Sequence, residues 1–152
     1  MTFVLPLHTL AVIVWLGGLF VLCVSFYPSV RQLESATALS LWHRILTRFF
    51  IWAWISMLLI LVSGIAMIFL AFGGFSGVPS IHRWNMLLGI PAIVLFGYLY
   101  FVPWRHFRDA MLSHDRMVAE KSIRQARTIM AIVLALGLVA SVVSVAGRYY
   151  ID

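Results

Sequence analysis

The sequence predicts an all-α fold, a bundle of four membrane-spanning helices, and two observations lead to this fold class. Of the 152 residues, 63% are hydrophobic and only 11% are charged, which is too apolar for a soluble domain. The apolar residues also gather in four segments, each long enough to cross a hydrocarbon core about 30 Å thick. Little sequence remains outside these segments and their connections, so we expect residues 1–152 to form a single four-helix domain.

The four predicted spans cover about residues 3–27, 49–72, 84–104 and 128–149. At about 1.5 Å per residue, a helix over each segment is roughly 30 Å long or more. The first span has no positive residue before it and no small-residue cleavage site after it, which favours a retained helix over a signal peptide. The single cysteine, Cys23, excludes an internal disulfide and any site built from several thiolates.

The connections are expected to carry further structure. Leu39, Trp42 and Leu46 recur at helical spacing, which predicts a short interfacial helix between the first and second spans that runs into the second. Residues 73–80 are rich in Gly, Pro and Ser and predict a turn, with Ser80 as a cap of the third helix. Residues 105–127 predict an extension of the third span, a bend near residues 113–115, and a lead-in to the fourth.

Positive charge is distributed unevenly between the two ends of the predicted bundle. Nine of the eleven Lys and Arg residues lie in the first and third connections, and only Arg83 and Arg148 lie at the other end. By the positive-inside rule, the first and third connections face the cytoplasm, and both termini face out (N-out/C-out). The net charge of +6 therefore indicates orientation and contact with membrane lipid, and not nucleic-acid binding.

This topology sorts the histidines by depth. His8 lies about five residues inside the first span, in the outer half of the membrane. An ionisable side chain at that depth costs roughly 2–4 kcal/mol or more, which makes it a functional candidate. A neutral imidazole is also the commonest metal ligand. The remaining histidines either share the outer end with His8, as His82 does, or lie at the inner face, as do His43, His106 and His114.

Two helix faces at this depth suit either a flat cofactor or close helix packing. On the first helix, His8, Trp15 and Gly18 fall on one face at offsets of three and four residues. On the fourth helix, one face carries small residues along most of its length and ends in a cation that could bind a carboxylate. Its members are Gly137, Ser141, Ser144 and Arg148.

The start of the third helix supplies the candidates for a second ligand. Met86 lies at about the depth of His8, and His82 lies one turn before it. Haem iron accepts a histidine together with a methionine or with a second histidine. We therefore expect His8 to pair with Met86 or His82 as metal ligands, and Arg83 and Arg148 to meet the haem propionates. For His8 alone, a hydrogen bond to a neighbouring carbonyl or to Thr9 remains the simpler alternative.

Several enzyme classes are disfavoured. The sequence has five acidic residues and none inside a span, so paired-carboxylate catalysis and carboxylate-bridged metals are not expected. No nucleophile elbow and no phosphate-binding loop is present.

The first helix, with His8 followed by Trp15-Leu16-Gly17-Gly18-Leu19 and then Tyr27-Pro28, resembles the bacterial four-helix membrane families around the CopD domain and the HemJ-type protoporphyrinogen oxidases. The resemblance implies haem b, with His8 as an axial ligand, in a multi-pass protein of the bacterial inner membrane. It also makes a HemJ-like porphyrinogen oxidation conceivable.

The leading hypothesis is an integral membrane b-type haem protein acting in electron transfer or in a haem-linked oxidation. Its redox partner would be quinone or another membrane redox protein, and a homo-oligomer is left open, as is whether the chain is an enzyme. Two alternatives stand beside it: a CopD-type protein of copper transport or resistance, and a non-catalytic partner subunit of a larger membrane complex. In the last case, His8 would be an interhelical hydrogen-bond donor.

Overall fold

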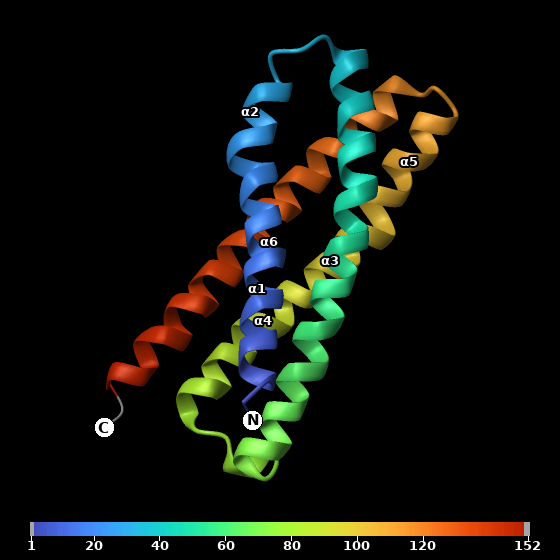
Figure 1. Cartoon of the computed structure of the whole chain (residues 1–152). Helices are drawn as coiled ribbons and strands as arrows, with labels where there is room; N and C mark the ends of the chain where they lie inside the picture. Colours follow the sequence, from blue (N-terminus) through green and yellow to red (C-terminus); the bar gives the residue numbers. More distant parts are fainter. Residues whose placement is uncertain (1, 151–152) are drawn as a thin grey trace.

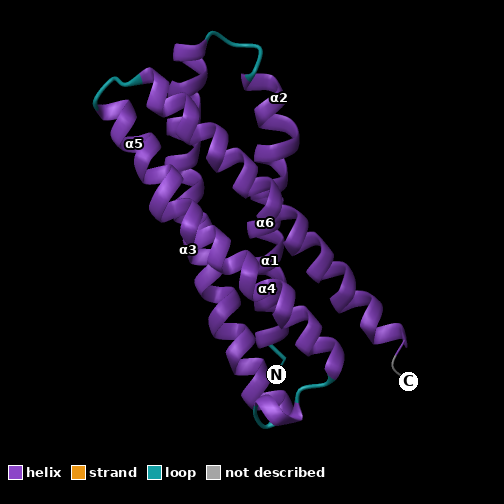
Figure 2. Ribbon diagram, turned by 180° about the vertical axis from the view of Figure 1, so that it is seen from behind, coloured by secondary structure: helices purple, strands orange, loops and turns teal. Residues whose placement is uncertain are grey.

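The computed structural model describes residues 2–150, without the side chains of residues 148 and 150, and this part of the chain is helical apart from short turns. Figure 1 shows long helices joined at the ends of an elongated bundle, and Figure 2 shows from behind that the loops lie only at those ends. In chain order, the elements are α1 (Val4–Phe20), the π-helical segment η1 (Val21–Phe26), α2 (Tyr27–Val30), α3 (Ser35–Phe72), the 3₁₀ turn η2 (Phe75–Gly77), α4 (Ser80–Leu99), the π-helical segment η3 (Tyr100–Trp104), α5 (Arg105–Leu112) and α6 (Arg116–Tyr150).

These elements form four long helical rods, because η1 joins α1 to α2 and η3 joins α4 to α5 without a break. All four rods are long and apolar enough to span a membrane, which confirms the predicted all-α, four-helix fold and indicates a multi-pass membrane protein. Large apolar side chains point outward along them, with Val62 and Leu70 each 66% exposed, as expected of helices that face lipid.

The helix boundaries differ from the expected ones in two places. The short helix expected between the first two spans is not a separate element, because its residues form the first turns of the continuous α3. Ser80 does not cap α4: Pro79 precedes the helix, Ser80 is its first residue, and no side chain bonds to its free N–H groups. At the far end of α3, Gly73 has φ of 67°, a left-handed conformation that glycine adopts without strain, and it ends the helix there.

The rods pack as two antiparallel pairs, α1 with α3 and α4 with α6. The start of α1, the end of α3, the start of α4 and the end of α6 lie together at one end of the bundle, here called the His8 end (Figure 1). The other end, formed by α2, α5 and the starts of α3 and α6, is called the basic end because most of the Lys and Arg residues lie there.

Aromatic side chains join the two pairs in the middle of the bundle. Phe96 of α4 is fully buried, and its ring centroid lies 5.7 Å from that of Trp15 on α1. On α3, Phe50 and Trp54 approach the same ring, at 5.8 Å and 5.6 Å. Phe96 thus contacts both helices of the opposite pair.

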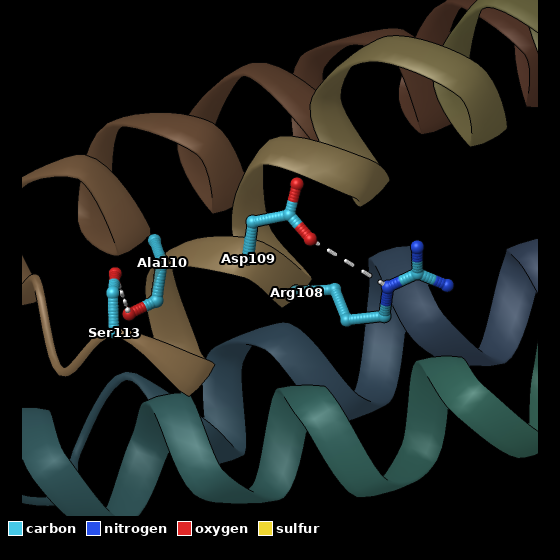
Figure 3. Close-up of polar contacts among 4 residues, drawn as sticks. All are labelled: Arg108, Asp109, Ala110 and Ser113. Atoms are coloured by element: carbon cyan, nitrogen blue, oxygen red, sulfur yellow. Dashed lines mark hydrogen bonds and ion pairs between the residues drawn. The ribbon is translucent and has the colours of Figure 1, made fainter.

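The bend expected near residues 113–115 is confirmed, and it is a tight turn between α5 and α6. His114 has φ of 57°, and the N–H of Asp115 donates to the carbonyl of Ala110 at 3.0 Å, which is the hydrogen bond of a Schellman helix end. Figure 3 shows the Ser113 hydroxyl donating to the same carbonyl, at 3.3 Å. Asp115 then caps α6, because its Oδ1 accepts the N–H of Val118 at 3.3 Å.

Because His114 is held in the left-handed region, His114→Gly is expected to stabilise the protein. Any side chain with a Cβ is strained there by about 1 kcal/mol, and glycine is not. The expected gain in the free energy of unfolding is therefore about 0.5–1 kcal/mol. Titration with a denaturing detergent would measure it, and an unchanged or lower midpoint for His114→Gly would contradict the strain.

Candidate functional site

His8 lies in the second turn of α1 and contacts a polar side chain of α3. Its Nδ1 is 2.7 Å from the hydroxyl oxygen of Ser63, a residue that is only 4% exposed. The Ser63 hydroxyl in turn hydrogen-bonds to the carbonyl of Leu59, one turn earlier on the same helix, and the Ile60 carbonyl lies at 3.3 Å. The imidazole is therefore held between two helices by a chain of hydrogen bonds.

This chain of hydrogen bonds favours one tautomer of the His8 imidazole. A hydroxyl has one proton to donate, and the Ser63 proton is directed to a backbone carbonyl of its own helix. With the proton there, its oxygen accepts from His8, and this arrangement favours the tautomer with the proton on Nδ1 and the lone pair on Nε2. Metal-bound histidines are oriented in this way, with one ring nitrogen donating to a protein oxygen and the other bound to the metal.

Gly64 lies beside the same ring. A Cβ built on Gly64 would be 3.6 Å from Cε1 of His8, an ordinary contact distance, so the edge of the imidazole lies against the backbone of α3. Sequence reasoning did not identify Ser63 as a site residue. The available signal was a serine in an apolar span at the depth of His8, on the neighbouring antiparallel helix.

Trp15 and Gly18 continue the His8 face of α1. The Trp15 side chain is only 5% exposed, and among the described residues its Nε1 has no hydrogen-bond partner. A buried N–H without an acceptor is uncommon and costs about 1–3 kcal/mol. At Gly18, a Cβ would lie 2.9 Å from Cε2 of Phe49, so α3 approaches α1 closely at that point.

The small face of α6 also serves helix packing. A Cβ on Gly137 would overlap Cδ2 of Leu16, which places α6 close to α1. The Ser141 hydroxyl donates to the Gly137 carbonyl at 2.8 Å, and Ser144 is half-buried. The side chain of Arg148 lies outside the described residues, so its expected contact with a propionate is not placed.

The candidates on α4 lie at the His8 end, on the other helix pair. His82 is half-buried, with its ring centroid 5.2 Å from that of Phe72 at the end of α3. Arg83 is exposed and Met86 is half-buried. The structure therefore brings His8 together with Ser63 and Gly64, and no hydrogen bond within the described residues joins His8 to His82 or Met86.

A metal held by protein side chains alone has little support in residues 2–150. No group of three His, Cys, Asp or Glu side chains there is close enough to share an ion. A single histidine suffices where the other ligands come from elsewhere, as in a porphyrin, whose nitrogens leave only the axial positions to the protein.

Comparison with known proteins assigns no family. No protein-family model, no curated protein and no solved structure matches this chain. The function must therefore be inferred from the residues around His8.

Proposed function

We propose that the chain is a membrane protein that binds one b-type haem, with Nε2 of His8 as an axial ligand. The observation that carries this proposal is the hydrogen bond between Nδ1 of His8 and Ser63, which leaves Nε2 as the ring nitrogen available to a metal. An unpaired lone pair on an imidazole in an apolar bundle is the group that haem iron binds.

The described residues fit a haem group in part. His8 supplies the ligand, and the unpartnered N–H of Trp15 on the same face of α1 could reach a polar group of the ligand. His82 or Met86 would be the second axial ligand, and Arg83 and Arg148 would meet the propionates. At Gly18 and Gly137 the space that a Cβ would take is already occupied by Phe49 and Leu16, so these two positions contribute less to the fit. Haem would supply one-electron transfer, to quinone or another membrane redox protein, or porphyrinogen oxidation.

The orientation follows from the charge. We infer that the basic end faces the cytoplasm of a bacterium and that both termini face out, because positive residues near span ends are retained inside. With 38 residues, α3 is about 57 Å long, roughly twice the hydrocarbon thickness. Its first turns therefore extend beyond the hydrocarbon core at the inner interface. The likeness of the first helix to the CopD and HemJ families supports the same membrane.

A visible absorbance spectrum tests the haem proposal directly. Protein purified from haem-replete cells is expected to show a Soret band, and His8→Ala is expected to lose it. His106→Ala is the matched control, because His106 is an exposed histidine on α5 at the opposite end. A wild-type protein without a Soret band, or a His8→Ala protein with an unchanged one, would exclude the proposal.

Ser63→Ala is expected to weaken haem binding without removing it. Loss of the hydroxyl leaves Nδ1 of His8 without its acceptor, and loss of such a partner typically weakens metal binding by about 10–100-fold. Haem titration of the apoprotein would measure the change. Ser56→Ala is the control, since Ser56 is equally buried on α3, also 4% exposed, and does not bond to His8. Equal affinities for the two variants would rule out a role of Ser63 in orienting the ligand.

The same hydrogen bond supports a second candidate function, a non-catalytic subunit in which His8 only links α1 to α3. In that case His8→Ala and Ser63→Ala would each lower stability by about 0.6–2 kcal/mol, and the double variant would be no worse than either. No porphyrin would be present in any of these proteins. No hydrogen bond or contact described above supports copper transport in the same way. Stoichiometric copper without porphyrin in the purified protein would be the evidence for that function.

A further inference from the structure

We propose that the basic end holds a binding site for a phosphate group of the kind carried by an anionic phospholipid. Two cavities of about 240 and 300 Å³ lie there, and four residues line both of them: Tyr27, Trp42, Arg124 and Arg127. We call the two cavities together the arginine cleft. His8 lines neither, so this site is separate from the proposed haem ligand.

The positive charge of the arginine cleft is not neutralised within the described part of the chain. Arg124 and Arg127 line both cavities, and Arg31 lines the second. Across residues 2–150, the one ion pair within 4.0 Å joins Arg108 to Asp109, neighbours on α5 and outside the cleft (Figure 3). The first cavity has no acidic residue in its lining, so the charged groups around an anion there would all be cations.

One carboxylate does line the second cavity. Glu120 of α6 lies there, and its Oε1 accepts a hydrogen bond from the Ser35 hydroxyl at the start of α3. This bond holds the two helix starts together and leaves three guanidinium groups facing one carboxylate in that cavity. The excess is still positive, and the first cavity is the better place for the anion.

The Arg127 guanidinium is held in place by Tyr27, but one of its N–H donors has no acceptor within residues 2–150. Its Cζ lies 4.0 Å from the ring centroid of Tyr27, a cation–π contact that holds the guanidinium plane. Its Nε is buried and has no hydrogen-bond partner among the described residues. A buried charged donor without an acceptor is costly, and a phosphate oxygen is the acceptor that the planar guanidinium fork binds best.

The walls of the arginine cleft suit an amphipathic ligand more than a free ion. Leu22 and Cys23 of η1 line the first cavity, together with Trp42. A π-helical turn widens the backbone at this point, and such turns are frequent at functional sites. A phosphate beside the arginines would leave its attached chain next to apolar side chains. Because the basic end is the proposed cytoplasmic end, it is also where anionic headgroups concentrate.

The test uses the full-length protein in a neutral detergent and follows its melting temperature. Short-chain phosphatidylglycerol is expected to raise the melting temperature saturably, and phosphatidylcholine of the same chain length is expected to raise it much less. In Arg127→Gln, the phosphatidylglycerol concentration for half-saturation should rise about tenfold or more. Arg105→Gln removes the same charge from an exposed position on α5 at the same end and should behave as wild type.

Two further arms complete the experiment. Arg124→Gln keeps the contact between Arg127 and Tyr27, so it tests the cleft even where Arg127→Gln fails to fold. Inorganic phosphate distinguishes a lipid headgroup from free phosphate as the ligand. If phosphate raises the melting temperature, Arg124→Gln abolishes that rise and phosphatidylglycerol adds nothing further, the site binds free phosphate. Equal effects of the two lipids with no phosphate effect, or an Arg105→Gln loss as large as that of Arg124→Gln, would overturn the proposal.

Discussion

Phe96→Ala is expected to lower the free energy of unfolding by about 3–5 kcal/mol, the usual effect of removing a large ring from a packed interior. Phe96 is completely buried and packs against rings on both helices of the opposite pair, so its loss leaves a cavity between the two pairs. Within a membrane, the loss arises from van der Waals contacts between helices and not from exclusion of water, because lipid tails are as apolar as the core.

The matched control is Phe20→Ala, which removes the same ring from a lipid-facing position on α1 that is 47% exposed. There, lipid or detergent replaces the ring, and the expected change is within about 0.5 kcal/mol. Unfolding by a denaturing detergent, followed by circular dichroism, would compare the two. Similar midpoints for Phe96→Ala and Phe20→Ala would mean that the two helix pairs do not meet through Phe96.

The four spans could be predicted from the sequence because the length of an apolar run reflects the thickness of the hydrocarbon core. The ends of the helices could not be predicted from the same signal. Residues 35–48 include polar and basic side chains, yet they form the first turns of α3 because a helix continues past the region where lipid requires apolar residues. Apolar runs therefore identify the membrane-crossing part of each helix, and its extensions have to be predicted from helical spacing, as for Leu39, Trp42 and Leu46.

At the candidate site too, the sequence identifies some residues, and others become evident only from how the helices pack. His8 could be singled out because it is the one histidine inside the first span. Its partner Ser63 was harder to identify, because Ser56 and Ser63 are equally buried serines two turns apart on nearly the same face of α3, and only Ser63 lies at the depth of His8. The arginine cleft is a similar case. Charge counting assigns Arg124 and Arg127 to the basic end, but only the fold shows that no carboxylate of residues 2–150 lies within 4.0 Å of their guanidinium groups.

Gly147→Ala is expected to destabilise the pair of α4 and α6 by about 1–3 kcal/mol, the range for overfilling a packed interface. A Cβ there would overlap Cγ1 of Ile81 and lie 3.2 Å from its Cβ. Ile81 cannot swing aside easily, because a β-branched side chain in a helix has one strongly preferred rotamer. Gly97→Ala on α4 is the control: its Cβ would meet nothing within 4 Å, so it should stabilise by about 0.5–1 kcal/mol.

A double-variant cycle separates this overlap from other effects of Gly147→Ala. Ile81→Ala removes Cγ1 and Cδ1, so Gly147→Ala should be far less harmful in that background, with a coupling of about 0.5–3 kcal/mol. Additive effects would show that the two residues do not touch in the membrane. In that case α6 would pack on α4 in a different register near its C-terminal end, and the position of Arg148 relative to the His8 end would change with it.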